Sequence, residues 1–178
     1  MELRRKQWGL AFLRQARSDL EGAAEVGTAS PHTLCVLLQM GFEKLGKAYR
    51  CRFEDPFDVR RLQTSHKGGY QMVLGLSHGA RFHGVPIPST LQRGAQNHRM
   101  LIKALEELQP ANAKRKSATT GQLEYPWVDG SGRIRCPAID LQLLKDIKNP
   151  FGSVYRPADS LKFGFEAAKN LQSWLETA

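Results

Sequence analysis

The sequence predicts an all-α protein, a helical bundle that carries a small β-hairpin insert. Apolar residues recur at three- and four-residue steps over several long segments, which is the period of an amphipathic helix. Alternation of apolar and polar residues, typical of strands, is confined to one short stretch. With 178 residues and 41% hydrophobic content, the chain suffices for one core. We therefore expect a single domain over residues 1–178, with a loop and hairpin insert at about 111–137.

The first two predicted helices have the most regular apolar pattern. Residues 3–26 carry one apolar stripe. Ser30 is a good N-cap for the next helix, and the proline after it is a good first residue because it lacks only a donor that would be unpaired there. We expect these helices to pack as an antiparallel pair. Gly41 and Gly46 lower helix propensity in the second helix, which indicates close approach by another helix.

The next two helices are separated by a loop rich in glycine and proline. The third helix is predicted to start near Ser65 and to carry Tyr70 and Val73. The loop covers residues 77–89. Ser89 is a suitable N-cap for a fourth helix that extends to about Leu108, where a proline follows two residues later.

The C-terminal third begins with a polar stretch and ends in a helix. Alternating residues on either side of an Asp-Gly-Ser-Gly turn predict a short hairpin between about 123 and 136. Residues 141–147 have only a weak period. The last helix is predicted from about Pro157 to Leu175, and its expected apolar stripe consists of Leu161, Phe165, Ala168, Leu171 and Trp174 or Leu175.

Charge and cysteine usage narrow the class of protein. Lys and Arg total 26 against 17 Asp and Glu, so the net charge is +9, which suits a phosphate-rich partner or serves solubility. Cys35, Cys51 and Cys136 are scattered, which is typical of reduced thiols in a cytoplasmic protein. The longest uncharged run is too polar for a membrane span, and a signal peptide is not expected. Neither a metal site nor a cofactor loop is predicted, since the His32-x2-Cys35 pair has no further ligand at a suitable spacing.

Three short patterns in the first half of the chain are similar to those of a known superfamily. Residues 39–48 read Gln-Met-Gly-Phe-Glu-Lys-Leu-Gly-Lys-Ala, and this arrangement of Gln, Glu-Lys and Lys-Ala resembles the HEPN superfamily, the nucleotide-binding helical domains of higher eukaryotes and prokaryotes. Residues 12–23 have the spacing of its first helix, and Ser65-His66 resembles a pair found near the start of its third. The resemblance covers residues 5 to about 76.

This resemblance implies a HEPN-like bundle that binds RNA, a nucleotide or another phosphate-rich partner. Many members are metal-independent RNases that act as homodimers in defence or toxin–antitoxin systems, and the implied protein partner is an antitoxin or a nucleotidyltransferase. Several lineages lack the catalytic motif, so a non-catalytic module that binds a nucleotide or a protein is the alternative.

The superfamily's RNases use an Arg-x4–6-His motif, which here matches Arg93-x4-His98 with Asn97 beside the histidine. His98 would act as the base on a ribose 2′-OH, and Arg93 would hold the phosphate. In the best-characterised form the asparagine directly follows the arginine, where this chain has Gly94. Positions five apart also lie about 140° around a helix, so we expect Arg93 and His98 to need a kink at Gly94 or a dimer contact to meet.

A second pair, Arg61-x4-His66, fits the same motif at the entry to the third helix. A buried core histidine is the alternative interpretation of His98, because it falls on the apolar stripe of its helix.

Basic residues also gather around the predicted hairpin, where they can contact nucleic acid beside Tyr125 and Trp127. They are Lys114, Arg115, Lys116, Arg133 and Arg135. The alternative is that the aromatic side chains cover the bundle while the basic ones are solvated. A second basic edge, on the second helix, is expected to face solvent, and it consists of Lys44, Lys47, Arg50 and Arg52.

Overall fold

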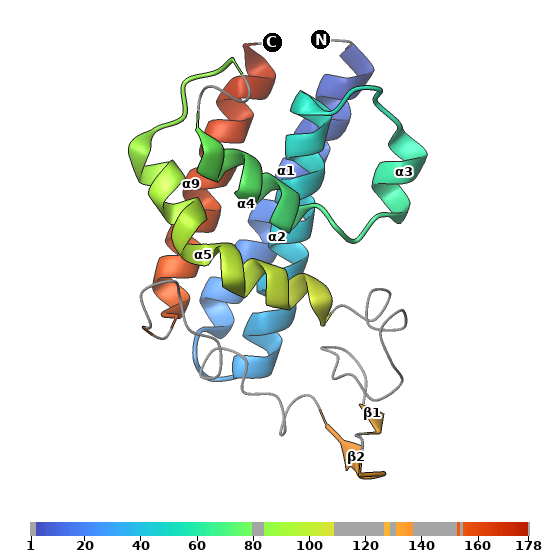
Figure 1. The fold of residues 1–178 in the computed structure, drawn as a ribbon, viewed down its shortest axis with the longest axis vertical. Helices are drawn as coiled ribbons and strands as arrows, with labels where there is room; N and C mark the ends of the chain where they lie inside the picture. The colour runs from blue at the N-terminus through green and yellow to red at the C-terminus, as the bar shows by residue number, and fades with distance from the viewer. Residues whose placement is uncertain are drawn as a thin grey trace.

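The computed structural model describes residues 3–79, 84–108, 127–128, 131–136, 153 and 155–177. This part of the chain contains six helices and one pair of short strands (Figure 1). The elements are α1 (Leu3–Val26), α2 (Pro31–Phe53), α3 (Val59–Thr64), α4 (Gly69–His78), α5 (Ser89–Glu107), β1 (Trp127–Val128), β2 (Ile134–Arg135) and α9 (Pro157–Glu176). The predicted all-α class is therefore confirmed for the described residues.

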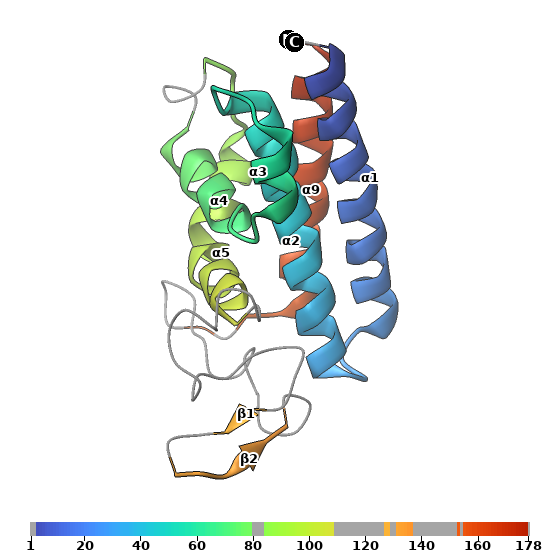
Figure 2. The ribbon, with the colours of Figure 1, turned by 90° about the vertical axis from the view of Figure 1, so that its right-hand side faces the viewer.

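Helix α2 is the centre of the bundle. Figure 2 shows α1, α2 and α9 side by side as one layer, with α4 and α5 packed on the other side of α2. Residues 41–51 of α2 are buried except for the half-buried Lys44. The chain ends meet at one end of this layer, where Lys6 Nζ donates to the Glu176 carbonyl oxygen at 2.8 Å.

The antiparallel packing of α1 and α2 is confirmed. Ser30 occupies the N-cap of α2, although its hydroxyl bonds Thr33 Oγ1 at 2.7 Å instead of a backbone N–H. At Gly41 an added Cβ would lie 3.1 Å from the Leu20 side chain of α1, so the predicted helix approach is correct there. At Gly46 the approaching backbone is that of Gly68, 2.0 Å from such a Cβ, and it belongs to a loop instead of a helix.

The region between α2 and α5 differs from the prediction. Helix α3 was not expected, and Asp58 starts it by accepting from the backbone N–H groups of Arg60 and Arg61 at 2.9 and 3.3 Å. The next helix, α4, begins at Gly69 and not near Ser65, because the backbone before it is packed against Gly46. Pro88 is the N-cap of α5, which makes Ser89 the first helical residue.

Helix α9 begins and ends within one residue of the predicted positions, but the face that it buries is not the predicted one. Phe165, expected in the core, is 36% exposed, whereas Phe163 is only 3% exposed. The Phe163 ring stacks on Phe42 of α2, with centroids 5.9 Å apart and planes at 26°. Gly164 lets α9 approach Leu20 of α1, which fixes this rotation.

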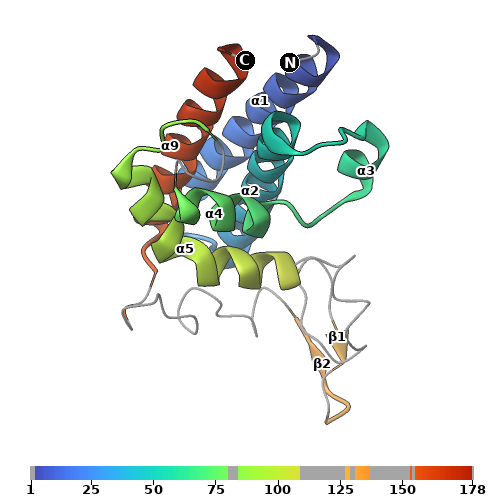
Figure 3. The ribbon, with the colours of Figure 1, turned by 45° about the horizontal axis from the view of Figure 1, so that its top comes forward.

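Strands β1 and β2 pair antiparallel within the predicted insert, with Trp127 opposite Arg135. Figures 1 and 3 show this pair beyond the end of the bundle that is opposite to the chain termini. Within the described ranges, none of the helices combines the length and the apolar character needed to span a membrane.

Candidate active site

A cavity of about 620 Å³ lies between α5 and α9. It is lined from α5 by Thr90, Arg93, Gly94, Asn97 and His98, and from the start of α9 by Tyr155, Arg156, Asp159, Lys162, Phe163 and Glu166. The α5 residues follow the spacing i, i+3, i+4, i+7, i+8, which is one face of a helix. The cavity is therefore a continuous trough between two helix faces.

Three contacts show how α5 and α9 are aligned along this trough. Thr90 Oγ1 donates to Glu166 Oε1 at 2.5 Å, and further along α5 Gly94 faces the Phe163 ring. At the other limit, the rings of His98 and Tyr155 have centroids 5.6 Å apart. Because α5 and α9 run in opposite directions along this face, the trough has a threonine end, marked by Thr90 and Glu166, and a histidine end, marked by His98 and Tyr155.

Gly94 allows the two helices to come this close. A Cβ at this position would lie 2.6 Å from Phe163 Cδ2, well inside ordinary van der Waals contact. The ring of Phe163 thereby reaches His98 and stacks on it, with centroids 5.1 Å apart and planes at 5°. One face of the imidazole is thus covered by an apolar ring.

The protonation pattern of His98 follows from its hydrogen bond. His98 Nδ1 lies 2.9 Å from the Gly94 carbonyl oxygen, which can only accept, so Nδ1 carries the hydrogen. In the neutral ring the lone pair is then on Nε2, for which no described residue provides a hydrogen-bond partner. This tautomer is the one that a proton acceptor in the cavity needs.

Burial also keeps His98 neutral. Its side chain is 7% exposed, and this burial lowers its pKa below the usual range, although the bond to Gly94 and the charge of Asp159 raise the pKa in part. The free imidazole is therefore the main form at neutral pH, as a general base requires.

Asn97 places a hydrogen-bond acceptor beside the histidine. Its Oδ1 is buried and has no partner among the described residues, while its backbone oxygen accepts from the Tyr155 hydroxyl at 2.8 Å. A buried acceptor without a donor is uncommon and costs free energy unless water or a ligand supplies one. Asn97 can therefore accept from a hydroxyl or amino group of a bound molecule.

The cavity also holds three cationic side chains that are not neutralised. Arg93, Arg156 and Lys162 are exposed, and none of them forms an ion pair or hydrogen bond within the described part of the chain. Two carboxylates, Asp159 and Glu166, share the lining, and Glu166 is engaged by Thr90. The free cations suit an anionic ligand such as a phosphodiester.

The structure brings together the first predicted set of catalytic residues. Arg93, Asn97 and His98 all line the cavity, and α5 is one continuous helix from Ser89 to Glu107. Arg93 and His98 line the same cavity without a kink between them, and no contact between their side chains is seen. The expectation that they need a kink or a dimer contact to meet stays a prediction.

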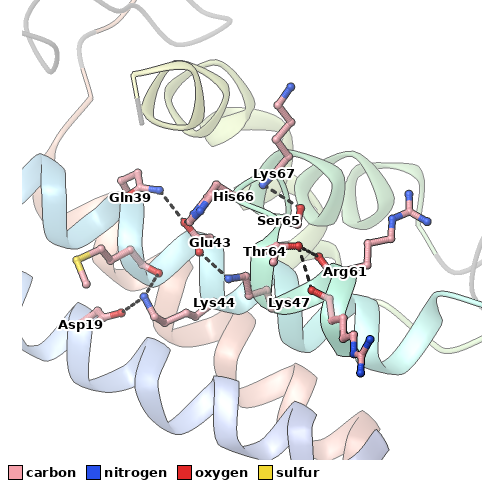
Figure 4. Close-up of polar contacts among 12 residues, drawn as sticks. Asp19, Gln39, Glu43, Lys44, Lys47, Arg61, Thr64, Ser65, His66 and Lys67 are labelled. Atoms are coloured by element: carbon pink, nitrogen blue, oxygen red, sulfur yellow. Dashed lines mark hydrogen bonds and ion pairs between the residues drawn. The ribbon is translucent and has the colours of Figure 1, made fainter. Parts of the chain in front are cut away.

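The second predicted pair is not brought together. Arg61 Nη1 lies 3.6 Å from Glu54 Oε1, whereas His66 Nδ1 lies 3.1 Å from Glu43 Oε2 (Figure 4). The arginine and the histidine thus contact different carboxylates.

Buried polar residues form a row on α2, Gln39, Glu43 and Lys47, which we call the α2 row. Gln39 Nε2 donates to Glu43 Oε2 at 3.1 Å, and Lys47 Nζ lies 2.8 Å from Glu43 Oε1 (Figure 4).

The prediction that the basic edge of this helix faces solvent was wrong for Lys47 and Arg50, which are each 6% exposed. Arg50 Nη2 donates to Glu54 Oε1 at 3.0 Å.

The other members of that edge are also engaged. Lys44 Nζ lies 3.3 Å from Asp19 Oδ2 of α1, and Arg52 Nε donates to the Trp174 carbonyl oxygen at 3.1 Å. These cations connect helices instead of presenting charge to a ligand.

The predicted nucleic-acid patch around the hairpin stays a prediction. Lys114, Arg115 and Lys116 lie outside the described residues. Arg133 is exposed before β2, and Arg135 is in that strand. Neither Arg133 nor Arg135 is among the described residues that line the α5–α9 cavity.

Several lining residues were not found from the sequence, namely Tyr155, Arg156, Asp159, Lys162 and Phe163. Their spacing on the last helix does contain a signal. Asp159, Lys162 and Glu166 recur at three- and four-residue steps, which marks one polar face. What the spacing does not show is that this face borders α5.

Comparison with family models, with curated proteins and with solved structures gives no match. The resemblance to the HEPN superfamily therefore rests on the residues of α1 and α2 and on Ser65-His66. Function has to be inferred from the chemistry of the α5–α9 cavity.

Proposed function

We propose that the protein is a HEPN-like, metal-independent endoribonuclease whose active site is the α5–α9 cavity. One observation carries the proposal. A neutral histidine, with its lone pair on Nε2, lines a cavity that also holds three cations with no ion-pair or hydrogen-bond partner among the described residues. A base beside an unneutralised cationic surface is the minimum that cleavage of a phosphodiester through its own 2′-hydroxyl requires.

The reaction follows from this arrangement. His98 Nε2 accepts the proton of a ribose 2′-OH, and the 2′-oxygen forms a bond to the adjacent phosphorus while the bond from phosphorus to the 5′-oxygen breaks. The imidazolium returns its proton to that 5′-oxygen, so no net proton is consumed. The products are a 2′,3′-cyclic phosphate and a 5′-hydroxyl.

The remaining lining residues support this step. The cations Arg156 and Lys162 stabilise the charge that develops on the phosphate oxygens, and Arg93 holds a phosphate group of the same strand. The buried Asn97 Oδ1 can accept a hydrogen bond from the ribose or base. Consistent with the resemblance, we also propose a cytoplasmic homodimer that acts in a defence or toxin–antitoxin system.

The direct test is cleavage of end-labelled single-stranded RNA in EDTA. We expect wild-type protein to cleave and His98→Ala to lose about 10²- to 10⁴-fold in rate. His66→Ala is the matched control, because His66 is the other histidine of an Arg-x4-His pair but contacts Glu43 outside the cavity. Circular dichroism verifies that both variants are folded.

Two results would reject this assignment. If His66→Ala abolishes cleavage and His98→Ala does not, the active site is elsewhere. If wild-type protein cleaves none of several RNAs but binds them, the protein is a binding module.

The non-catalytic module is the second candidate, and one observation favours it. His98 is only 7% exposed, whereas a base has to come within about 2.6–3.2 Å of the proton that it removes. In that case the free cations still bind RNA or a nucleotide. Binding would then weaken in Arg156→Ala, without any product of cleavage.

A further inference from the structure

We propose that the trough contains two phosphate subsites, one formed by Arg156 at the histidine end and one formed by Arg93 nearer the threonine end. The ligand would then be a strand with two neighbouring phosphates, and Arg156 would be the residue that holds the phosphate undergoing cleavage. This inference rests on the proposed function for the role of His98.

Arg156 directly follows Tyr155, the residue whose ring packs against His98. The preceding residue, Tyr155, is 6% exposed, and its hydroxyl donates to the backbone oxygen of Asn97 at 2.8 Å. Its ring also lies 5.6 Å from that of His98. The backbone leading into Arg156 is thus fixed against α5 at the level of His98, while the Arg156 side chain is exposed and has no ion-pair partner among the described residues.

Arg93 lies further along the trough. It precedes His98 by five residues, which is about 7.5 Å along a helix axis. Side chains on a helix also lean toward its N-terminus, so Arg93 leans toward Thr90 and away from His98. A phosphate bound at the histidine end is therefore not the one that Arg93 contacts best.

Lys162 lies between these two positions. It is adjacent in sequence to Phe163, the ring that faces Gly94 in the middle of the trough. The order along the trough is then Arg93, Lys162 and Arg156. Three cations in a row match a chain of phosphates better than the single phosphate group of a mononucleotide.

The roles of Arg93 and Arg156 can be distinguished with substrates that differ by one phosphate. The substrates are the dinucleoside monophosphate UpA, its 5′-phosphorylated form pUpA and its 3′-phosphorylated form UpAp. Cleavage of UpA involves only one phosphate. In either pUpA or UpAp, the added phosphate would occupy the second subsite and raise kcat/KM above that of UpA. The substrate that shows this increase identifies the direction in which the strand binds.

We expect Arg156→Ala to lower kcat/KM about 10- to 100-fold for all three substrates. Arg93→Ala should lower kcat/KM for UpA less than Arg156→Ala does, and it should remove the advantage of the substrate with the added phosphate. Arg99→Ala is the control, since Arg99 is an exposed arginine of α5 that does not line the cavity. It should behave as wild type on every substrate.

Equal losses for Arg93→Ala on UpA and on both phosphorylated substrates would overturn the two-subsite proposal, and so would a silent Arg156→Ala. Failure of the proposed function is distinguishable, because wild-type protein would then cleave none of the three. In that event the 2′-deoxy forms are titrated by calorimetry. If Arg93→Ala weakens binding only of the form with the added phosphate, two subsites are still supported. If it weakens binding of all three forms equally, or if none of them binds, the two-subsite proposal is rejected.

Discussion

The α2 row and the α5–α9 cavity contain the same kinds of side chain in opposite arrangements. In the row, Lys47 and His66 both contact the carboxylate of Glu43, at 2.8 and 3.1 Å. In the cavity, Arg93 and Arg156 have no acidic partner among the described residues. The comparison shows that charge alone does not mark a functional site. Charges that neutralise one another hold the bundle together, and charges that have no partner are available for a ligand.

The pKa shifts of Glu43 and His98 show the same contrast between the two regions. Burial alone raises the pKa of Glu43, but hydrogen bonds and charges from Lys47 and His66 outweigh it, so the pKa is lowered and the carboxylate stays ionised. Burial is the dominant effect on His98, whose pKa falls and whose ring stays neutral. The α2 row therefore stabilises ions, while the cavity stabilises an uncharged base.

The largest effect on stability should come from breaking the α2 row. Glu43→Ala leaves Lys47 buried without its carboxylate, and we expect the free energy of unfolding to fall by about 3–5 kcal/mol. Chemical denaturation measures this change. The double variant with Lys47→Ala should recover part of the loss, since the unpaired charge is then gone; a single variant within about 1 kcal/mol of wild type would show that the pair is not structural.

A comparison of two glycines should give the next effect. Gly94→Ala places a Cβ against the Phe163 ring, and we expect a loss of about 1–3 kcal/mol together with weaker cleavage. Gly46→Ala meets the backbone of Gly68, which cannot rotate away as a side chain can, so its loss in thermal stability should be larger. If Gly94→Ala proves the more damaging of the two, the cavity is the more rigid region.

A smaller effect is expected on the pH dependence of cleavage. The charge of Asp159 raises the pKa of His98, so Asp159→Asn should lower that pKa further. Because the base works only when unprotonated, the acid limb of kcat/KM should move to lower pH. Glu166→Gln serves as the control and should leave the limb in place. An acid limb that does not move in Asp159→Asn would mean that another group controls it.

The smallest effect on stability should come from removing an exposed cation of the cavity. Arg93→Ala and Lys162→Ala delete exposed side chains that have no partner in the described part of the chain, and we expect the free energy of unfolding to change by less than about 0.5 kcal/mol. The salt dependence of RNA binding should decrease in the same variants, by about 0.7 in the log–log slope for each lost phosphate contact. A large loss of stability would assign these cations to the structure instead.

The long helices were predictable because their apolar period is local information. α1, α5 and α9 begin and end within about one residue of the expected positions, and α2 begins at the expected proline. The six-residue α3 was missed, since so short a helix has no periodicity to detect and depends on the cap at Asp58. The choice between Phe163 and Phe165 was also wrong, because both fit an apolar stripe and only packing against α2 and α5 decides which is buried.

Three of the eleven residues that line the candidate site could be predicted. Arg93, Asn97 and His98 were found because motif spacing within one helix is visible in the sequence. Arg156 lies 58 residues beyond His98 in the chain, and only the packing of α9 on α5 brings it to the cavity. Lys47 was misassigned to a solvated edge for a related reason, since sequence does not show that α2 is enclosed by its neighbours.

Enclosure of α2 also has a consequence for hydrogen exchange. Amide protons between Gly41 and Cys51 are covered by α1, α4, α5 and α9, so they should exchange with deuterium only when the whole bundle opens. In α3 only Leu62 is fully buried, and the first turn of α9 is exposed at Ala158 and Asp159, so we expect the amides of these two segments to exchange faster. The protein therefore consists of a slowly exchanging axis and a faster perimeter, and the proposed active site lies on the boundary between them.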